Sequence, residues 1–297
     1  MKLTGVYTAL VTPLDEQGQI DFDALGELLE RQITAGVSGV VPMGTTGESP
    51  TMSNEEHDEV IRYTVEKVAG RIQVWAGTGS NNTAQAIRTT TEAARSGVDG
   101  ALIVTPYYNK PSQAGLLRYF TDICSATDLP IIVYNIVGRT AVNVETPTLE
   151  EIARLPNVAA VKEASGNLGQ MSDVIERIAM HRERPFYVLS GDDALTVPLM
   201  SIGGHGVISV TSNLVPERMV AMVNAALAGD FIEARAIHYA LLPLFRAAFI
   251  ESNPAPIKAA MNLCGIPAGS VRSPLAPLSA HSQQQLEKTL QDMNLMA

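Results

Sequence analysis

Short runs of apolar residues recur along the chain about every thirty residues, which is the length of a strand with its following helix. Each run is continuous rather than alternating, a pattern typical of parallel strands that are covered on both faces. The sequence predicts eight such strands: Gly5–Val11, Gly39–Val41, Ile72–Ala76, Gly100–Val104, Ile131–Asn135, Ala159–Lys162, Tyr187–Ser190 and Gly206–Ser209. Strands that alternate with helical segments in this number predict an α/β fold, a (β/α)8 TIM barrel.

Polar residues mark where several helices begin. Ser53-Asn54-Glu55-Glu56 has the pattern of a capping box, and Asn82 or Thr83 can cap the next helix. After Val215 the pattern contains helices only, predicted at Pro216–Ala228, Ile232–Ile250, Pro256–Leu263 and from His281 onward. We therefore predict a catalytic barrel over residues 1–214 and a C-terminal α-helical region over residues 215–297 that packs on it.

The chain has 297 residues, of which 46% are hydrophobic, so it can bury a substantial core within one barrel. No apolar stretch approaches the roughly 20 residues needed to span a bilayer. The first residues also lack the apolar segment of a signal peptide. Cys124 and Cys264 are far apart in the sequence and fit neither a disulfide framework nor a metal-ligand spacing. We expect a cytoplasmic protein with reduced thiols.

The formal net charge is −10 and no cluster of Lys and Arg appears, which argues against a nucleic-acid partner. The five His residues are scattered, so a metal site is not expected. Gly77-Thr78-Gly79 lacks the third glycine of a dinucleotide fingerprint, and Gly44-Thr45-Thr46-Gly47 lacks the ending of a P-loop. An acidic chain can still bind a small acid through local donors, such as one Arg and a few backbone N–H groups.

Lys162 is the residue that points most directly to chemistry, because it ends an apolar strand. A buried ammonium is costly, so such a lysine is usually paired, or it has a lowered pKa and acts as a nucleophile. Tyr134 ends the preceding strand, and the two side chains would emerge from adjacent strands at the same end of the sheet. An amine beside a phenol suggests Schiff-base chemistry with a carbonyl substrate. A structural lysine, either snorkelling or salt-bridged with Glu163 nearby in the sequence, is the competing interpretation, and Lys162 alone leaves both open.

Polar residues and glycines follow other strand ends, where a barrel gathers its functional groups. The Gly-Thr-Thr-Gly turn at residues 44–47 offers backbone groups and hydroxyls that suit a carboxylate, although alone it would more often be structural. Tyr107 and Tyr108 follow the fourth strand and would either pack or line a site. Asp192-Asp193 follows the seventh strand and is expected to cap a helix rather than to bind a metal.

Taken in chain order, these segments resemble the pyruvate-dependent class I aldolase superfamily, which includes the N-acetylneuraminate lyases, and within it the dihydrodipicolinate synthase family. The segments are Gly44-Thr45-Thr46-Gly47-Glu48-Ser49, Thr105-Pro106-Tyr107-Tyr108-Asn109, Tyr134-Asn135, Gly138-Arg139-Thr140, Val161-Lys162-Glu163-Ala164, Ser190-Gly191-Asp192-Asp193 and Gly203–Thr211. The resemblance covers essentially the whole chain. It implies a lyase that needs no cofactor beyond its own lysine and that assembles as a homotetramer, a dimer of dimers.

The resemblance implies that Lys162 condenses with pyruvate to a Schiff base. The derived enamine would attack L-aspartate 4-semialdehyde to give 4-hydroxy-tetrahydrodipicolinate, in the diaminopimelate route of lysine biosynthesis. Tyr134 would relay protons together with Thr45 and Tyr108. In family members the tyrosine at the position of Tyr108 enters the site of the neighbouring subunit.

The resemblance also implies how the substrates are held. Thr45 and Thr46 would bind the pyruvate carboxylate, Arg139 the semialdehyde carboxylate, and Gly191 and the Ile208 carbonyl would line the pocket. Two alternatives stay open. One is a related class I aldolase that cleaves a 2-keto-3-deoxy sugar acid or sialic acid, although such enzymes usually lack an arginine at this position. The other is a non-catalytic barrel that only binds a ligand.

Two departures from the family pattern have consequences. The loop Ile136–Ala141 lacks the proline that the family commonly has there, which would leave Arg139 less restricted. Some members are inhibited by lysine, and the matching positions here are Ser49, Pro50, Asn54, His57, Asn81, Gln85 and Tyr107. Sensitive enzymes tend to carry a glutamate where this chain has Gln85 and often a histidine where it has Asn54. We expect weak or absent inhibition by lysine.

Overall fold

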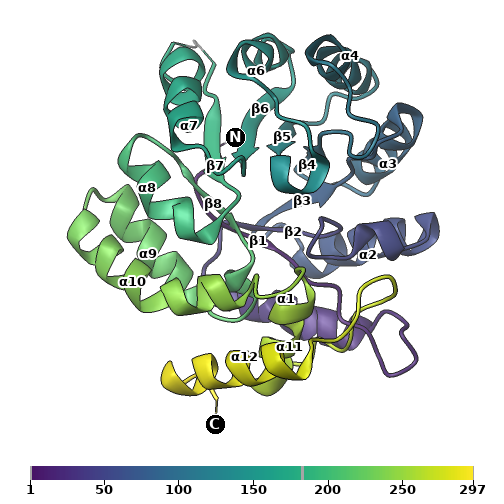
Figure 1. Ribbon diagram of the computed structural model, residues 1–297. Helices are drawn as coiled ribbons and strands as arrows, with labels where there is room; N and C mark the ends of the chain where they lie inside the picture. The colour runs from purple at the N-terminus through teal and green to yellow at the C-terminus, as the bar shows by residue number, and fades with distance from the viewer. Residues whose placement is uncertain (1, 182–183, 297) are drawn as a thin grey trace.

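The computed structural model describes residues 2–181 and 184–296, in which eight parallel strands form a closed barrel inside a layer of helices (Figure 1). The strands follow one another around the barrel in chain order, and β8 pairs with β1 to close it. They are β1 (Gly5–Ala9), β2 (Gly39–Val41), β3 (Gln73–Gly77), β4 (Gly100–Val104), β5 (Ile131–Asn135), β6 (Val158–Glu163), β7 (Tyr187–Ser190) and β8 (Gly206–Ser209). The predicted (β/α)8 fold is confirmed.

The predicted strands differ from the observed ones only at some ends. β1 stops at Ala9 because the N–H of Val11 donates to the side chain of Asn213 (3.1 Å) instead of continuing the ladder. β3 begins and ends one residue later than predicted, and β6 extends by one residue at each end.

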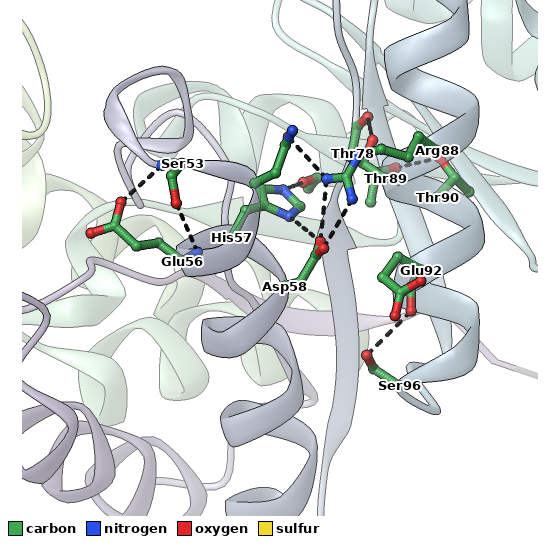
Figure 2. Close-up of polar contacts among 12 residues, drawn as sticks. Ser53, Glu56, His57, Asp58, Thr78, Arg88, Thr89, Thr90, Glu92 and Ser96 are labelled. Atoms are coloured by element: carbon green, nitrogen blue, oxygen red, sulfur yellow. Dashed lines mark hydrogen bonds and ion pairs between the residues drawn. The ribbon is translucent and has the colours of Figure 1, made fainter.

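Twelve α-helices are present in the described chain, and none of them is both long and apolar enough to cross a membrane. α2 begins with the predicted capping box, in which Ser53 and Glu56 exchange side chain–backbone hydrogen bonds (Figure 2). Asn82 caps α3. The first eight helices are α1 (Phe22–Thr34), α2 (Asn54–Val68), α3 (Thr83–Arg95), α4 (Gln113–Cys124), α5 (Val137–Thr140), α6 (Thr146–Ala153), α7 (Leu168–Val174) and α8 (Thr196–Ser201).

Four further helices follow β8, as the sequence predicts: α9 (Pro216–Leu227), α10 (Phe231–Ala247), α11 (Ala255–Leu263) and α12 (Ala280–Asp292). α9 packs against β1, and α10 packs on α9. Figure 1 shows α11 and α12 beside α1, and one apolar cluster joins Leu25, Ile257 and Leu290 of these three helices. The helical region therefore shares its core with the barrel, and the division at residue 214 stays a prediction.

The alternation of side chains along each strand decides what reaches the barrel interior. Ile132 and Tyr134 of β5 and Ala160 of β6 belong to the inner core, whereas Val161 packs outward against the helices. Since successive side chains of a strand point to opposite faces, Lys162 lies on the inner face with Ala160. The fold thus carries a lysine into the centre of the barrel at the carboxyl end of β6.

Candidate active site

The carboxyl ends of β5 and β6 bring an amine and a phenol together. Tyr134 and Lys162 are register partners in these adjacent strands. Lys162 Nζ lies 4.2 Å from the centroid of the Tyr134 ring. Only 5% of Lys162 and 6% of Tyr134 are exposed. The structure therefore places the two groups side by side, as the sequence predicts.

Burial makes Lys162 a weak base. It lowers the pKa of Lys162 to about 7, while the Asp193 carboxylate raises this pKa and the Arg139 guanidinium lowers it further. None of the ion pairs formed by the residues that the structure describes includes Lys162. Near pH 7 a large fraction of this amine is uncharged and can act as a nucleophile.

Glu163 does not pair with Lys162, so the salt bridge of the competing interpretation is absent. Its carboxylate accepts the N–H of Ser165 (2.7 Å) and the amide of Asn135 (3.2 Å). The two side chains leave β6 on opposite faces, because the strand repeat is two residues.

Tyr134 keeps its proton at neutral pH. Burial raises the pKa of its phenol to about 12, although Arg139 and a hydrogen bond with Thr45 act in the opposite direction. A protonated phenol in contact with an uncharged amine can donate or accept a proton through its hydroxyl. The pair therefore combines a nucleophile with a proton carrier.

The turn after β2 presents two threonines at the same end of the barrel. The N–H groups of Gly47 and Glu48 donate to the carbonyls of Gly44 and Thr45 at 3.1 Å, which closes the turn. Thr45 lines the cavity. Thr46 is 3% exposed, and its hydroxyl accepts a hydrogen bond from Asn253 Nδ2 at 3.0 Å. Thr45 thus faces the cavity, and Thr46 is held by a hydrogen bond from Asn253 of the C-terminal region.

Arg139 lies on the single turn of α5, and its side chain lines the same cavity. The hydroxyl of Thr140 donates to the carbonyl of Ile136 (2.8 Å) and closes this turn in the absence of a proline. Arg139 Nη2 donates to the backbone carbonyl of Asn253 at 3.3 Å. The hydrogen bonds of Thr140 and Arg139 thus fix the conformation of the loop that lacks the proline.

Of the other predicted residues, some lie inside the barrel near Lys162 and one lies outside the cavity. A Cβ added to Gly191 would lie 3.1 Å from both Cγ and Cε of Lys162, so glycine leaves room for the stem of the amine. Ile208 belongs to the inner core of the barrel. Tyr108 is 89% exposed at φ 73° and does not line the cavity. A single chain thus leaves Tyr108 outside the site.

The cavity has a volume of about 330 Å³, and Thr45, Tyr134 and Arg139 are part of its wall. Within the described ranges, Arg139 is the only Lys, Arg, Asp or Glu side chain that lines it. A guanidinium without a nearby competing carboxylate favours small anionic ligands even in a chain of net charge −10. The described residues also contain no cluster of three or more His, Cys, Asp or Glu that could hold a metal ion.

Most positions that match the lysine site line this same cavity, namely Ser49, Pro50, Asn54, His57, Gln85 and Tyr107. Asn81 is not part of the wall, and its carbonyl accepts a hydrogen bond from Asn109 (2.8 Å). His57 Nε2 lies 2.9 Å from the carbonyl of Gly77, and burial lowers the pKa of His57. The ring is therefore uncharged near pH 7.

The amide oxygen of Asn54 on this wall is already engaged by protein donors. Asn54 Oδ1 accepts from Gln85 Nε2 (2.6 Å) and from Arg88 Nη2 (3.0 Å). Arg88 also forms an ion pair with Asp58 at 3.0 Å (Figure 2). An ammonium that entered here would meet no unpaired carboxylate on the described part of the cavity wall.

A buried ion pair that was not predicted from the sequence lies behind the turn that carries the threonines. Lys258 Nζ lies 2.7 Å from Glu48 Oε1, and these side chains are 1% and 0% exposed. Lys258 lies in an otherwise largely apolar helix, α11. A lysine within an apolar segment is also the feature that singles out Lys162, so Lys258 could have been identified from the sequence.

Asp193 has a role other than the predicted helix cap, and Asn253 was not predicted. Asp192 caps a short helical turn, as predicted for the pair, by accepting the N–H of Ala194 (2.8 Å). Asp193 instead accepts the N–H and the hydroxyl of Thr211 at 2.9 and 3.0 Å, and burial raises its pKa. Asn253 has no signal in the sequence, because an asparagine before a proline suggests only a turn.

Comparison with known proteins gives consistent results. The dihydrodipicolinate synthetase family matches residues 2–293. A 4-hydroxy-tetrahydrodipicolinate synthase of Protochlamydia amoebophila is 50% identical over 294 residues, which cover 99% of this chain and 97% of that protein. The structure of the same enzyme from Methylacidiphilum fumariolicum is 46% identical with a TM-score of 0.95 and complete coverage of both chains. A dihydrodipicolinate synthase of Acinetobacter baumannii, complexed with pyruvate, is 37% identical with a TM-score of 0.96 and covers 99% of this chain and 100% of its own.

Proposed function

The chain belongs to the dihydrodipicolinate synthetase family, and we propose that it condenses pyruvate with L-aspartate 4-semialdehyde to 4-hydroxy-tetrahydrodipicolinate. This is a lyase-type reaction of lysine biosynthesis by the diaminopimelate route. The observation that carries the proposal is the contact between Lys162 and Tyr134 inside the barrel.

Lys162 supplies the covalent chemistry. Its uncharged amine attacks the ketone carbon of pyruvate, and uptake of one proton with loss of water leaves an iminium whose positive nitrogen withdraws electrons. Loss of a methyl proton then gives an enamine, which forms a carbon–carbon bond to the aldehyde. The amino group of the adduct next attacks the iminium carbon, closes the ring and releases Lys162. Lys162 is the only group that bonds covalently to the substrate in these steps, and their protons need a separate carrier.

Tyr134 moves the protons of these steps. Lys162 Nζ lies over its ring, and its hydroxyl is hydrogen-bonded with Thr45. The same proton carrier can therefore serve both the loss of water and the closure of the ring. We assign Tyr108 to the same relay, contributed by a neighbouring subunit. Its nearly complete exposure on a left-handed backbone supports this assignment, because a strained exposed aromatic is readily explained by a partner that covers it.

The two substrate carboxylates are held by different groups. Thr45 and Thr46 bind the carboxylate of pyruvate beside Lys162, with Gly191 and the Ile208 carbonyl as the adjoining wall. Arg139 binds the carboxylate of the semialdehyde, a task that suits a planar guanidinium with paired donors. We further propose that the protein is a homotetramer in the cytoplasm, and the relay assigned to Tyr108 would need at least a dimer.

The choice of second substrate is tested by a direct comparison. The purified protein is assayed with pyruvate and aspartate semialdehyde, and separately for cleavage of sialic acid and of 2-keto-3-deoxy sugar acids. We expect kcat/KM for the semialdehyde to exceed that for cleavage by at least about a hundredfold, because Arg139 has no partner on a neutral polyol chain. Faster cleavage of a sugar acid would overturn the proposed function in favour of the related aldolase, and inactivity in both assays would favour a ligand-binding barrel.

Inhibition by lysine is expected to be weak. Titration of the initial rate with lysine up to about 1 mM should leave most of the activity. The reason is that the described cavity wall has no unpaired carboxylate to bind the ammonium group of lysine. The matched variant Gln85→Glu adds that carboxylate and should strengthen inhibition by about tenfold. Micromolar inhibition of the unmodified protein would show that the reasoning from Gln85 is wrong.

A further inference from the structure

Asn253 lies between the two groups proposed to bind carboxylates. Its Nδ2 donates to the hydroxyl of Thr46 at 3.0 Å, and its backbone carbonyl accepts from Arg139 Nη2 at 3.3 Å. The residue is 4% exposed and is separated by about two hundred positions from Thr46. One residue of the C-terminal region thus touches both the turn after β2 and the loop after β5.

The polarity of the first hydrogen bond fixes what the Thr46 hydroxyl can do. An amide nitrogen is a donor only, so Thr46 Oγ must accept from it and cannot direct its own hydrogen there. The hydroxyl hydrogen is therefore left for another acceptor. A carboxylate bound beside Lys162 is such an acceptor, and hydrogen bonds to charged acceptors are stronger than those between neutral groups.

The same stretch of chain holds the turn at a second point. Lys258 donates three hydrogen bonds, to Glu48 Oε1 (2.7 Å), to the carbonyl of Thr12 (2.9 Å) and to the carbonyl of Ser270 (2.6 Å). Glu48 accepts the N–H of Arg272 (2.9 Å) with its other oxygen. Every proton of this buried ammonium is thus used, and the residue two positions after Thr46 cannot move without breaking an ion pair.

We propose that Asn253 is a positioning residue for pyruvate, which orients the Thr46 hydroxyl towards the substrate carboxylate, and that Lys258 and Glu48 hold the turn on which this orientation depends. The inference rests on the proposed function, because it takes pyruvate as the ligand beside Lys162. The C-terminal helical region would thus contribute to substrate binding, because its Asn253 acts on the substrate through Thr46.

The test is a double-mutant cycle on pyruvate binding. Asn253→Leu removes the donor at similar volume, Thr46→Val removes the hydroxyl, and the third variant carries both changes. We expect each single variant to raise the KM for pyruvate by about tenfold with a smaller change in kcat. The double variant should be no worse than Thr46→Val, because Asn253 acts through that hydroxyl. Effects that multiply in the double variant would overturn the inference.

A matched control separates positioning from stability. Gln32 is 0% exposed and bridges the hydroxyl of Thr8 (2.7 Å) and the carbonyl of Ser212 (3.0 Å), outside the cavity wall. Gln32→Leu should lower the melting temperature and leave the KM for pyruvate unchanged. If Asn253→Leu behaves in the same way, with a normal KM, the inference is wrong.

Asn253→Asp keeps the test decisive if the leucine variant does not fold. The carboxylate has nearly the shape of the amide but can only accept, so it would draw the Thr46 hydrogen away from the substrate. A KM for pyruvate that rises by more than tenfold supports the inference, and an unchanged KM overturns it. Borohydride trapping of pyruvate on Lys162 in the unmodified protein is measured in parallel. Its absence would refute the proposed function, whereas its presence with normal KM values in the variants would refute only the role of Asn253.

Discussion

Replacement of Lys162 with alanine is expected to abolish the covalent adduct with pyruvate and to lower kcat/KM on the order of a thousandfold or more. The reason is that Arg139 is the only Lys or Arg on the described cavity wall, and it cannot lose its proton to become a nucleophile in place of Lys162. The measurement is reduction with borohydride in the presence of pyruvate, followed by mass spectrometry of the peptides. The unmodified protein should carry a reduced pyruvyl group on Lys162, and the variant none.

Two controls make this result interpretable. Lys162→Met keeps the volume of the side chain, so it should fold normally and lack the adduct equally. The pH profile of adduct formation tests the burial of the amine. Because burial lowers the pKa of Lys162 to about 7, the uncharged fraction and the rate should rise from about pH 6 to 8 and then level off. An adduct on another residue, or a rate that still rises steeply above about pH 9, would contradict the assignment of Lys162.

Replacement of Tyr134 with phenylalanine is expected to lower kcat by about a hundredfold to ten-thousandfold while the fold is retained. The ring that packs against Lys162 stays in place, but the hydroxyl that carries protons is lost. Steady-state kinetics with both substrates gives the change in kcat, and borohydride trapping shows how much slower the Schiff base forms. Turnover equal to that of the unmodified protein would refute the proton relay.

Tyr7→Phe is the matched control for this variant. Tyr7 is 1% exposed in the same inner core, and its hydroxyl donates to Gln73 Oε1 (3.0 Å), away from the cavity wall. Loss of that hydrogen bond should cost about 1 kcal/mol in the free energy of unfolding without a change in kcat. A similar loss of kcat in both variants would indicate a general effect of removing a buried hydroxyl.

Much of the fold was predictable because its signals are local. Apolar runs of strand length, the capping box at Ser53 and the helices after Val215 each depend on residues close together in the chain. The contact between Tyr134 and Lys162 was also predictable, because parallel strands that are neighbours in sequence align their carboxyl ends in a barrel. The strand repeat of two residues places Lys162 and Glu163 on opposite faces, and Ala160 in the inner core shows that Lys162 is the one that points inward.

The partners of the groups behind the site were not predictable, because these partners are distant in the chain. Lys162 and Lys258 are both lysines in largely apolar segments, and the sequence does not distinguish them. The fold brings Glu48 to 2.7 Å from Lys258 and leaves Lys162 facing a phenol. Similar local patterns thus give one paired ammonium and one weakly basic amine.

The sequence by itself determined the barrel and the placement of Lys162 and Tyr134 at the ends of neighbouring strands, since these follow from the spacing and the order of the strands. Only the tertiary structure decided which buried lysine is paired, what closes the loop of Arg139, and that Asn253 reaches Thr46. The physical reason is that charge compensation and hydrogen-bond polarity depend on atoms within a few ångströms in space, wherever they lie along the chain.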